Sequence, residues 1–173
     1  MPQPIIPSVD GKRQFAAFAA AVVAFIVDEQ ERLLLLAHPK RAGAWEVISG
    51  ALEAEETVLD GVLRETREEA GPHIQVRPLG PVHIASFRYD DNVPHMLSLN
   101  YLLAYEGGVI EPGDDMTGSE YRWWTLAELE ASESNVIIPR DLWLLRRAIE
   151  LYRLWQDTDF NLQPTHKPLH RPK

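Results

Sequence analysis

Apolar positions along the chain predict several strands with helices between and after them. Residues 15–27 and 33–37 are apolar almost throughout and flank a polar turn at 28–31, which predicts two strands that are buried on both faces. Shorter apolar runs, separated by proline or by polar residues, predict further strands at 74–76, 82–89, 96–105 and 121–125. The glycine-rich stretch 107–118 is expected to be a mobile connection between the last two.

The segment 57–70 has the spacing of an amphipathic helix. Its apolar stripe, which we expect to face the core, consists of Leu59, Leu63, Thr66 and Ala70. Thr57, with Asp60 three positions later, resembles a capping box in which Asp replaces Glu. Glycine and proline at positions 71 and 72 cannot continue the helix, so both of its ends are marked.

Three acidic side chains occupy one sector of this helix. Glu65, Glu68 and Glu69 are expected to point together, away from the apolar stripe. Like charges at this spacing are unfavourable unless something positive lies between them, and Mg²⁺ is a cation that commonly joins protein carboxylates to substrate phosphates. Gly61 falls in the same sector and leaves room for a loop or a ligand to approach. A charged helix face is usually just solvated, so the spacing alone leaves that simpler interpretation open.

The order of residues between positions 50 and 72 favours the metal site, because it resembles the Nudix box. In that pattern a glycine, a glutamate, an Arg-Glu pair, a Glu-Glu pair and a second glycine stand at fixed offsets. The matching residues are Gly50, Glu56, Arg64, Glu65, Glu68, Glu69 and Gly71.

The departures from the pattern lie in the loop and at the aliphatic positions. Ile48 and Ser49 stand where Pro-Gly is common, and Glu55 stands where glycine often precedes the first glutamate. Thr66 and Pro72 occupy the two aliphatic positions. These changes concern the shape of the loop and leave the carboxylates intact.

The resemblance implies an α/β fold, namely a Nudix-type α/β/α sandwich with a mixed sheet, in which the box forms a loop and a helix, plus a C-terminal helix. We expect this domain to span residues 15–156. An N-terminal arm, 1–14, would precede it, and a flexible C-terminal tail, 157–173, would follow it. The tail carries two histidines, which are weak evidence for a metal.

The resemblance also assigns roles to the charged residues. Glu65, Glu68 and Glu69 would hold Mg²⁺, with Mn²⁺ as an alternative, and one of them would orient or deprotonate the attacking water. Arg64 would project away from the metal and fix Glu56 by paired hydrogen bonds. Outside the box, Glu120 precedes a tryptophan-containing strand and would be a further ligand or the base. The alternative for Glu120 is an exposed acid at a strand edge.

The implied reaction is hydrolysis of the diphosphate linkage in a nucleoside diphosphate joined to another moiety. Trp45 and Tyr89 are candidates to stack on the base, although aromatic residues between strands more often belong to the core. The proline-rich signature of the family's NADH-cleaving members is not evident. The substrate stays open among nucleotide sugars, ADP-ribose, dinucleoside polyphosphates and nucleoside triphosphates.

The composition of the chain argues against some classes of binding partner. The formal charge of −9 argues against non-specific binding to nucleic acid or to an anionic membrane, and it makes a metal necessary for an anionic substrate. The chain has no cysteine, which is compatible with a cytoplasmic protein. Lys12-Arg13 before the apolar run 15–27 superficially resembles a secretory signal. That run is too short for a membrane span, and the domain needs it as its first core strand.

The last helix is expected at 140–155, with apolar spacings of three and four. Trp143 and Leu144 widen its apolar surface, so part of it is a candidate homodimer contact. Two functional alternatives remain beside the hydrolase: a non-catalytic Nudix-fold module that binds nucleotides or regulates, and an acidic interaction domain whose helix merely resembles the box.

Overall fold

The computed structural model describes residues 5–132, 137–138 and 142–158. The described elements, in chain order, are β1 (Ile5–Pro7), β2 (Gln14–Ala16), β3 (Ala19–Val27), β4 (Leu33–Ala37), β5 (Trp45–Glu46), β6 (Ile48–Ala51), α1 (Val58–Ala70), β7 (Ile74–Phe87), β8 (Met96–Gly108), the 3-10 helix η1 (Asp114–Met116), β9 (Tyr121–Trp124), α2 (Leu126–Ala131), β10 (Ile137–Ile138) and α3 (Leu142–Trp155).

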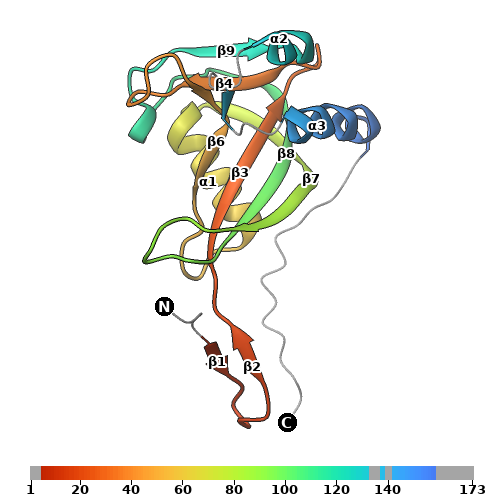
Figure 1. The fold of residues 1–173 in the computed structure, drawn as a ribbon. Helices are drawn as coiled ribbons and strands as arrows, with labels where there is room; N and C mark the ends of the chain where they lie inside the picture. The colour runs from red at the N-terminus through yellow and green to blue at the C-terminus, as the bar shows by residue number, and fades with distance from the viewer. Residues whose placement is uncertain (1–4, 133–136, 139–141, 159–173) are drawn as a thin grey trace.

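A mixed sheet forms the centre of the molecule. Within the described residues it has eight strands, in the order β10-β5-β4-β3-β8-β7, with β6 also paired to β3 and β9 to β4. Strands β3 and β8 run parallel along the whole of β3, whereas β6 and β4 are antiparallel to β3. α1 and α3 lie on opposite sides of this sheet (Figure 1). The expected α/β/α sandwich with a mixed sheet is therefore confirmed.

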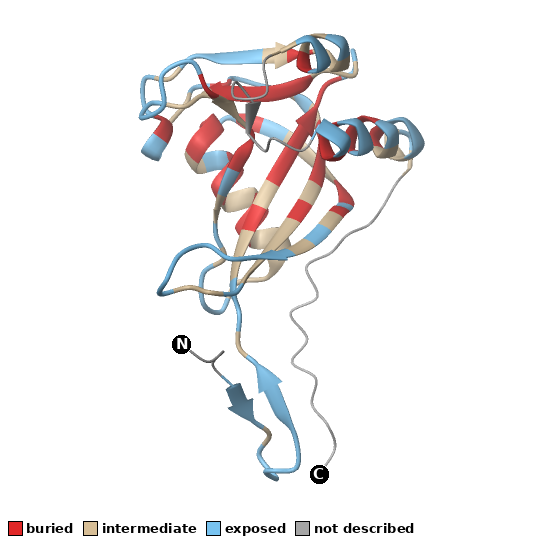
Figure 2. Ribbon diagram, viewed as in Figure 1, coloured by how far each residue is buried: buried red, intermediate tan, exposed pale blue. Residues whose placement is uncertain are grey.

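Both faces of the central strands are buried, as their continuous apolar character predicted. Along β3, Phe25 belongs to the cluster packed against α3, which includes Leu145. Its neighbours in the strand, Ala24 and Ile26, face the cluster on the α1 side, which includes Val62. This alternation follows from the two-residue period of a strand, and Figure 2 shows the resulting buried centre.

α1 begins and ends where the sequence predicted. The Thr57 hydroxyl accepts a hydrogen bond from the Asp60 backbone at 3.1 Å, and the Asp60 carboxylate accepts one from the Thr57 backbone at 3.3 Å. The helix stops at Gly71, whose φ of 106° favours glycine.

The buried face of α1 differs from the predicted stripe. Glu65 and Glu69 are buried together with Val62, whereas Leu59 and Leu63 are only half-buried. Thr66 and Ala70 of the predicted stripe are buried as expected, and Glu65 and Glu69 are buried as well, which the stripe did not predict. The reason is that β6 and the loop after it lie against this side of the helix, which no period within the helix itself reports.

The strand boundaries differ in two places. The predicted strand 15–27 is divided, because β2 ends at Ala16 and β3 begins at Ala19. β1 and β2 form an exposed hairpin that extends away from the sheet (Figure 1) and continues two residues past the expected arm, 1–14. The predicted strands 74–76 and 82–89 are one long strand, β7. Register shifts at its prolines, which an edge strand tolerates, keep it paired to β8.

The glycine-rich connection is packed onto the end of α1. Met116 is buried, and the Gly113 backbone donates a hydrogen bond to the Glu69 carbonyl at 3.1 Å. A Cβ on Gly113 would lie 2.7 Å from the Glu68 carbonyl, so the glycine permits this close approach. The expectation of a mobile connection overlooked these contacts.

The C-terminal helix is present, and it covers the face of the sheet opposite α1. Leu144 is buried in the core, so it does not extend an exposed apolar face as the dimer argument supposed. The expected flexible tail lies almost wholly outside the described residues. Among the described helices, none is both long and apolar enough to cross a membrane.

Candidate active site

The first feature of the site is the contact between Gly50 on β6 and Glu65 on α1. Glu65 is only 8% exposed. A Cβ on Gly50 would lie 1.9 Å from Glu65 Oε1, so no larger residue fits there while the carboxylate keeps its place. Burial raises the pKa of Glu65. The close approach of the Glu65 carboxylate therefore explains why position 50 is a glycine.

Glu69 lies one helical turn further along, beside the same strand. Its Oε2 accepts a hydrogen bond from the Ser49 backbone at 3.1 Å, and the residue is 9% exposed. The pKa of Glu69 is raised to about 8, mainly by burial. The Ser49 hydrogen bond lowers this pKa, whereas the charges of Glu65, Glu46 and Asp115 raise it. A buried acid among other acids is a position that favours a bound cation.

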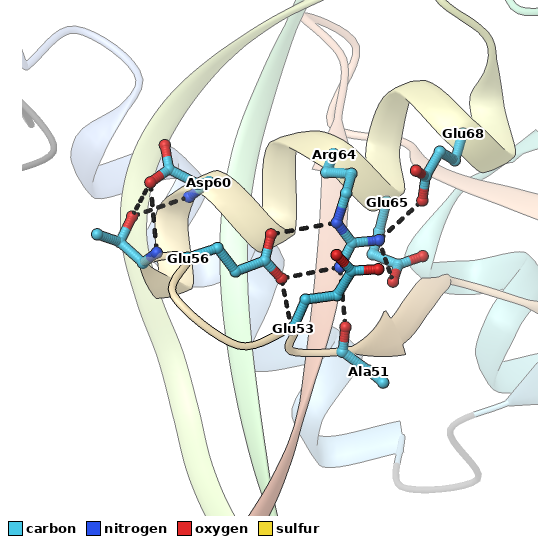
Figure 3. A network of polar contacts seen from close by, with 8 residues as sticks. Ala51, Glu53, Glu56, Asp60, Arg64, Glu65 and Glu68 are labelled. Atoms are coloured by element: carbon cyan, nitrogen blue, oxygen red, sulfur yellow. Dashed lines mark hydrogen bonds and ion pairs between the residues drawn. The ribbon is translucent and has the colours of Figure 1, made fainter.

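Arg64 connects α1 to the loop before it (Figure 3). Its Nε and Nη2 donate to the two carboxylate oxygens of Glu56 at 3.1 and 2.9 Å, and Nη2 also donates to the Ala51 carbonyl at 2.9 Å. These bonds lower the pKa of Glu56. A Cβ on Gly61 would lie 2.9 Å from Glu56 Oε1, so the helix glycine leaves space for this loop, as the sequence suggested.

The third nitrogen of Arg64 points toward the acidic cluster. Nη1 donates to Glu65 Oε1 and to Glu68 Oε2, both at 2.8 Å. The expected pairing of Arg64 with Glu56 is therefore present, but the expectation that Arg64 projects away from the glutamates was wrong. The planar guanidinium reaches both sides at once because its donors are spread around one plane.

The donor set suits a hard divalent cation. Each of Glu65, Glu68 and Glu69 uses one carboxylate oxygen in the bonds above, and the other oxygen contacts no hydrogen-bond donor within the described residues. Three carboxylate oxygens are thus available on one side of α1, which are the ligands that Mg²⁺ prefers. In the conformation of the described part of the chain, no group of three or more histidine, aspartate or glutamate side chains is arranged to hold a metal ion, so these oxygens would have to move together to bind one.

Glu120 makes no side-chain hydrogen bond or ion pair with Glu65, Glu68 or Glu69 among the residues described. Its side chain is exposed just before β9, and it makes no side-chain hydrogen bond or ion pair among the residues described. The acids whose charge acts on Glu69 from outside α1 are instead Glu46 and Asp115, which the sequence analysis missed. Glu46 was detectable as a lone acid within the apolar stretch 44–48, whereas Asp115 gave no such signal.

The two aromatic candidates lie elsewhere. Trp45 packs edge-on against Trp124, with ring centroids 5.6 Å apart, at the margin of the core. Tyr89 is 64% exposed in the connection between β7 and β8. Neither residue borders the cavity that lies nearest to Glu69.

That cavity, of about 310 Å³, lies between the sheet and α3. Its lining is largely apolar and includes Ser49, His83, Phe87, Asn100 and Trp143. We call it the α3 cavity. Ser49 belongs both to its wall and to the hydrogen bond with Glu69, so one residue of β6 connects the cavity to Glu69.

Comparison with known proteins identifies the family. The family model described as NUDIX domain matches residues 17–148. The chain belongs to the NUDIX domain family. The residues matched include the whole box and extend into α3, so the resemblance read from the sequence is confirmed.

Curated relatives of this NUDIX chain share about a third of their aligned residues with it. The NAD-capped RNA hydrolase NudC of Vibrio parahaemolyticus is 32% identical over 130 residues, which are 72% of this chain and 45% of that protein. The ADP-ribose pyrophosphatase of Methanocaldococcus jannaschii is 30% identical over 104 residues, 59% of this chain and 60% of that one. The chain thus spans less than half the length of NudC.

Solved structures support the same fold. A NUDIX family hydrolase from Clostridium perfringens has a TM-score of 0.62 at 20% identity, covering 76% of this chain and 96% of its own. An ADP-ribose pyrophosphatase from Streptococcus suis has a TM-score of 0.62 at 19% identity, covering 79% and 93%.

Proposed function

We propose that this NUDIX protein hydrolyses the diphosphate linkage of a nucleoside diphosphate joined to another moiety, in a reaction that depends on Mg²⁺. One observation carries the proposal: Glu65, Glu68 and Glu69 on α1 each keep one carboxylate oxygen available for a metal ion. Mn²⁺ would be accepted by the same oxygens.

Each residue has a role in this reaction. Glu65, Glu68 and Glu69 would hold the metal, which would neutralise charge on the phosphate oxygens and lower the pKa of a bound water. Glu69 is our candidate to accept the proton of the attacking water, because it is a buried carboxylate among other acids and would lose its own proton once a cation binds beside it. Arg64 keeps Glu65 and Glu68 in position while it ties down the loop at Glu56.

The names of the relatives narrow the substrates to be tested first. They include an ADP-ribose pyrophosphatase, several hydrolases of NAD-capped RNA and an 8-oxo-dGDP phosphatase. The acidic charge of this chain favours a small molecule over RNA. Comparison of NAD with NAD-capped RNA as substrates tests that expectation directly.

The deciding experiment is a hydrolysis panel of ADP-ribose, NAD, nucleotide sugars, dinucleoside polyphosphates and nucleoside triphosphates. Each substrate is assayed with Mg²⁺, with Mn²⁺ and with a chelator. We expect turnover of at least one diphosphate with metal, none with the chelator, and a loss of at least 100-fold in Glu69→Gln, in line with the loss of a general base. Glu29→Gln, an exposed acid on another loop, serves as the control. Equal turnover by wild type and Glu69→Gln would reject the mechanism.

The two alternatives give different results in the same samples. A non-catalytic binding module would be stabilised by Mg²⁺ plus nucleotide, by about 2.7 kcal/mol at one hundred times the dissociation constant, without turnover. An acidic interaction domain would show neither stabilisation nor turnover. Thermal unfolding with and without both ligands separates the two.

A further inference from the structure

A cleft of about 580 Å³ lies at the turn between β3 and β4. The turn, the end of β8 and one residue of β9 border it, and the residues that matter below are Arg32, Tyr105, Glu106, Gly107 and Trp123. We call it the Trp123 cleft. Among the described residues, its lining has no member in common with the α3 cavity or with the three glutamates of α1.

One wall of the Trp123 cleft is aromatic. Tyr105 and Trp123 are both half-buried, and their ring centroids lie 5.0 Å apart with the planes at 58°. The guanidinium of Arg32 lies over the Trp123 ring, 5.9 Å from its centroid, and its Nε donates to the Asp28 carboxylate at 2.8 Å. The rings are thus supported from the turn. Aromatic-lined grooves of this kind are the surfaces on which proline-rich segments bind.

The rim of the cleft is acidic. Three acidic residues and one arginine border it. Glu106 is exposed, and its Oε1 accepts a hydrogen bond from Arg77 Nε at 2.6 Å. Its other carboxylate oxygen contacts no donor among the described residues. A basic side chain can therefore bind Glu106 without displacing Arg77.

The C-terminal segment leaves the domain beside this cleft. Arg77 donates from Nη2 to the Gln156 carbonyl at 2.7 Å and from Nη1 to the Thr158 carbonyl at 3.3 Å. The guanidinium that pairs with Glu106 therefore also holds the residues that follow α3. Thr158 is the last residue that the structure describes, and residues 159–173 continue from this point.

The sequence of this segment complements the cleft. Residues 160–173 include no acid, and their basic residues are Lys167, Arg171 and Lys173. Proline recurs every fourth position, at 164, 168 and 172, and the first two prolines each have a basic residue three positions later. A polyproline II helix has three residues per turn, so in that conformation each such pair lies on one side. At about 3.1 Å per residue, the chain from Thr158 to Pro164 spans up to about 19 Å.

We propose that residues 160–173 bind in the Trp123 cleft of their own chain, with a proline against the rings of Tyr105 and Trp123 and the basic residue three positions later at Glu106. Attachment at Thr158 gives the segment a high effective concentration at the cleft, so weak contacts suffice. The contact does not involve the carboxylates of α1, and it is independent of the proposed function.

The test uses the absence of cysteine from the chain. Leu169→Cys gives the 173-residue protein a single thiol, to which a nitroxide is attached. We expect the nitroxide to remove the NMR signals of the Trp123 indole N–H and the Gly107 backbone N–H, and reduction by ascorbate to restore them. A nitroxide at Val9→Cys, on the exposed hairpin, should leave both signals intact.

Charge variants of the nitroxide-labelled protein test the pairing with Glu106. Glutamine at all three basic positions of the segment should restore both signals. The matched control places glutamine at Lys12, Arg13 and Lys40, which changes the net charge equally outside the segment. Glu106→Gln should restore the signals in part. Glu130→Gln, at an exposed acid that also pairs with an arginine, should not.

Two further results would overturn the inference. One is that the Trp123 and Gly107 signals are unaffected by the nitroxide at position 169, or stay lost after the basic residues of the segment are replaced. The other comes from a mixture of isotope-labelled protein without nitroxide and unenriched protein with it. Signal loss in that mixture would show that the segment of a second copy occupies the cleft. Neither result depends on hydrolysis, so the proposed function is tested separately.

Discussion

The backbone N–H of Ser49 donates a hydrogen bond of 3.1 Å to Oε2 of Glu69, twenty residues further along the chain. Ser49 also borders the α3 cavity, so one peptide unit connects the carboxylates of α1 to the space between the sheet and α3. The strand β6 therefore connects the α1 side of the sheet with the α3 side. It also buries Glu69 among other acids, and this has measurable consequences.

Glu69 should make the metal-free protein less stable as the pH rises. The pKa of Glu69 is about 8 in the folded protein, against an ordinary value of 4.5, so folding favours its protonated form. That contribution is complete below pH 4.5 and is lost as the pH rises through about 8. Urea unfolding in chelator at pH 5, 6.5 and 8 should show the wild type losing a few kcal/mol relative to Glu69→Gln.

The control for this pH series is Glu55→Gln, which changes an exposed acid in the loop before α1. It should follow the wild-type curve. If the wild type and Glu69→Gln instead change in parallel across this pH range, Glu69 does not have a raised pKa in the folded protein.

Arg64→Lys should disrupt the loop and the acidic cluster together. A lysine is a point charge and cannot replace the paired bonds to Glu56 while it also contacts Glu65 and Glu68. We expect the free energy of unfolding to fall by about 2 to 3 kcal/mol, as for the loss of partly buried charged hydrogen bonds, and hydrolysis to fall at least tenfold. Arg67→Lys, an exposed change on the same helix, should alter neither. Wild-type stability in Arg64→Lys would contradict the bracing role.

Gly50→Ala tests the contact between β6 and Glu65. The added Cβ would lie 1.9 Å from Glu65 Oε1, so the carboxylate must move. We expect a loss of about 1 to 3 kcal/mol in stability, typical of overpacking, and weaker Mg²⁺ binding by calorimetry. The neighbouring exposed change Ala51→Ser should preserve both, and unaltered Mg²⁺ affinity in Gly50→Ala would count against Glu65 as a ligand.

The acids around Glu69 can be ranked by their effect on its titration. Glu46→Gln and Asp115→Asn each remove a charge that raises the pKa of Glu69, so both should lower it. Glu120→Gln should leave it unchanged, because the Glu120 side chain is exposed and apart from the cluster. NMR titration of the glutamate carboxyl groups measures these shifts. A shift of Glu69 in Glu120→Gln would return Glu120 to the site that the sequence assigned to it.

Glu55 stands where the family often has glycine, and its φ is 69°. That conformation costs a non-glycine residue roughly 1 to 2 kcal/mol, while glycine loses roughly 0.5 to 1 kcal/mol more backbone entropy on folding. Glu55→Gly should therefore stabilise the protein by about 0.5 to 1 kcal/mol in urea unfolding. Glu31→Gly is the comparison, because Glu31 has a φ of 59° but also pairs with Arg153, so its gain should be smaller. A destabilised Glu55→Gly would show that the loop tolerates its glutamate without strain.

The sequence predicted elements whose signals are local. The limits of β4 were predicted to the residue, since an apolar run flanked by turns is a property of neighbouring positions. The caps of α1 were predicted for the same reason. The prolines of β7 misled the prediction, because a bulged edge strand tolerates them and only the pairing with β8 shows where that edge lies.

The candidate site also combines features that a local sequence pattern predicts with features that depend on distant parts of the chain. The order of charged residues in the box identified the family and the pairing of Arg64 with Glu56, because that pairing bridges one loop and one helix turn. The sequence alone could not report that Glu65 and Glu69 are buried, since β6 covers them after pairing antiparallel to β3. Nor did it find the α3 cavity, because strands and a helix that are distant in the chain form it.

The sequence by itself determined the family, the helix with its three glutamates and the chemistry that those carboxylates favour. This is because residues at fixed offsets along one helix point to the same side, where they can bind one cation. The tertiary structure decided how deeply Glu65 and Glu69 are buried, which acids act on Glu69 and which residues line the α3 cavity. Burial and long-range proximity arise only when strands far apart in the chain pair into one sheet, and no local pattern contains that information.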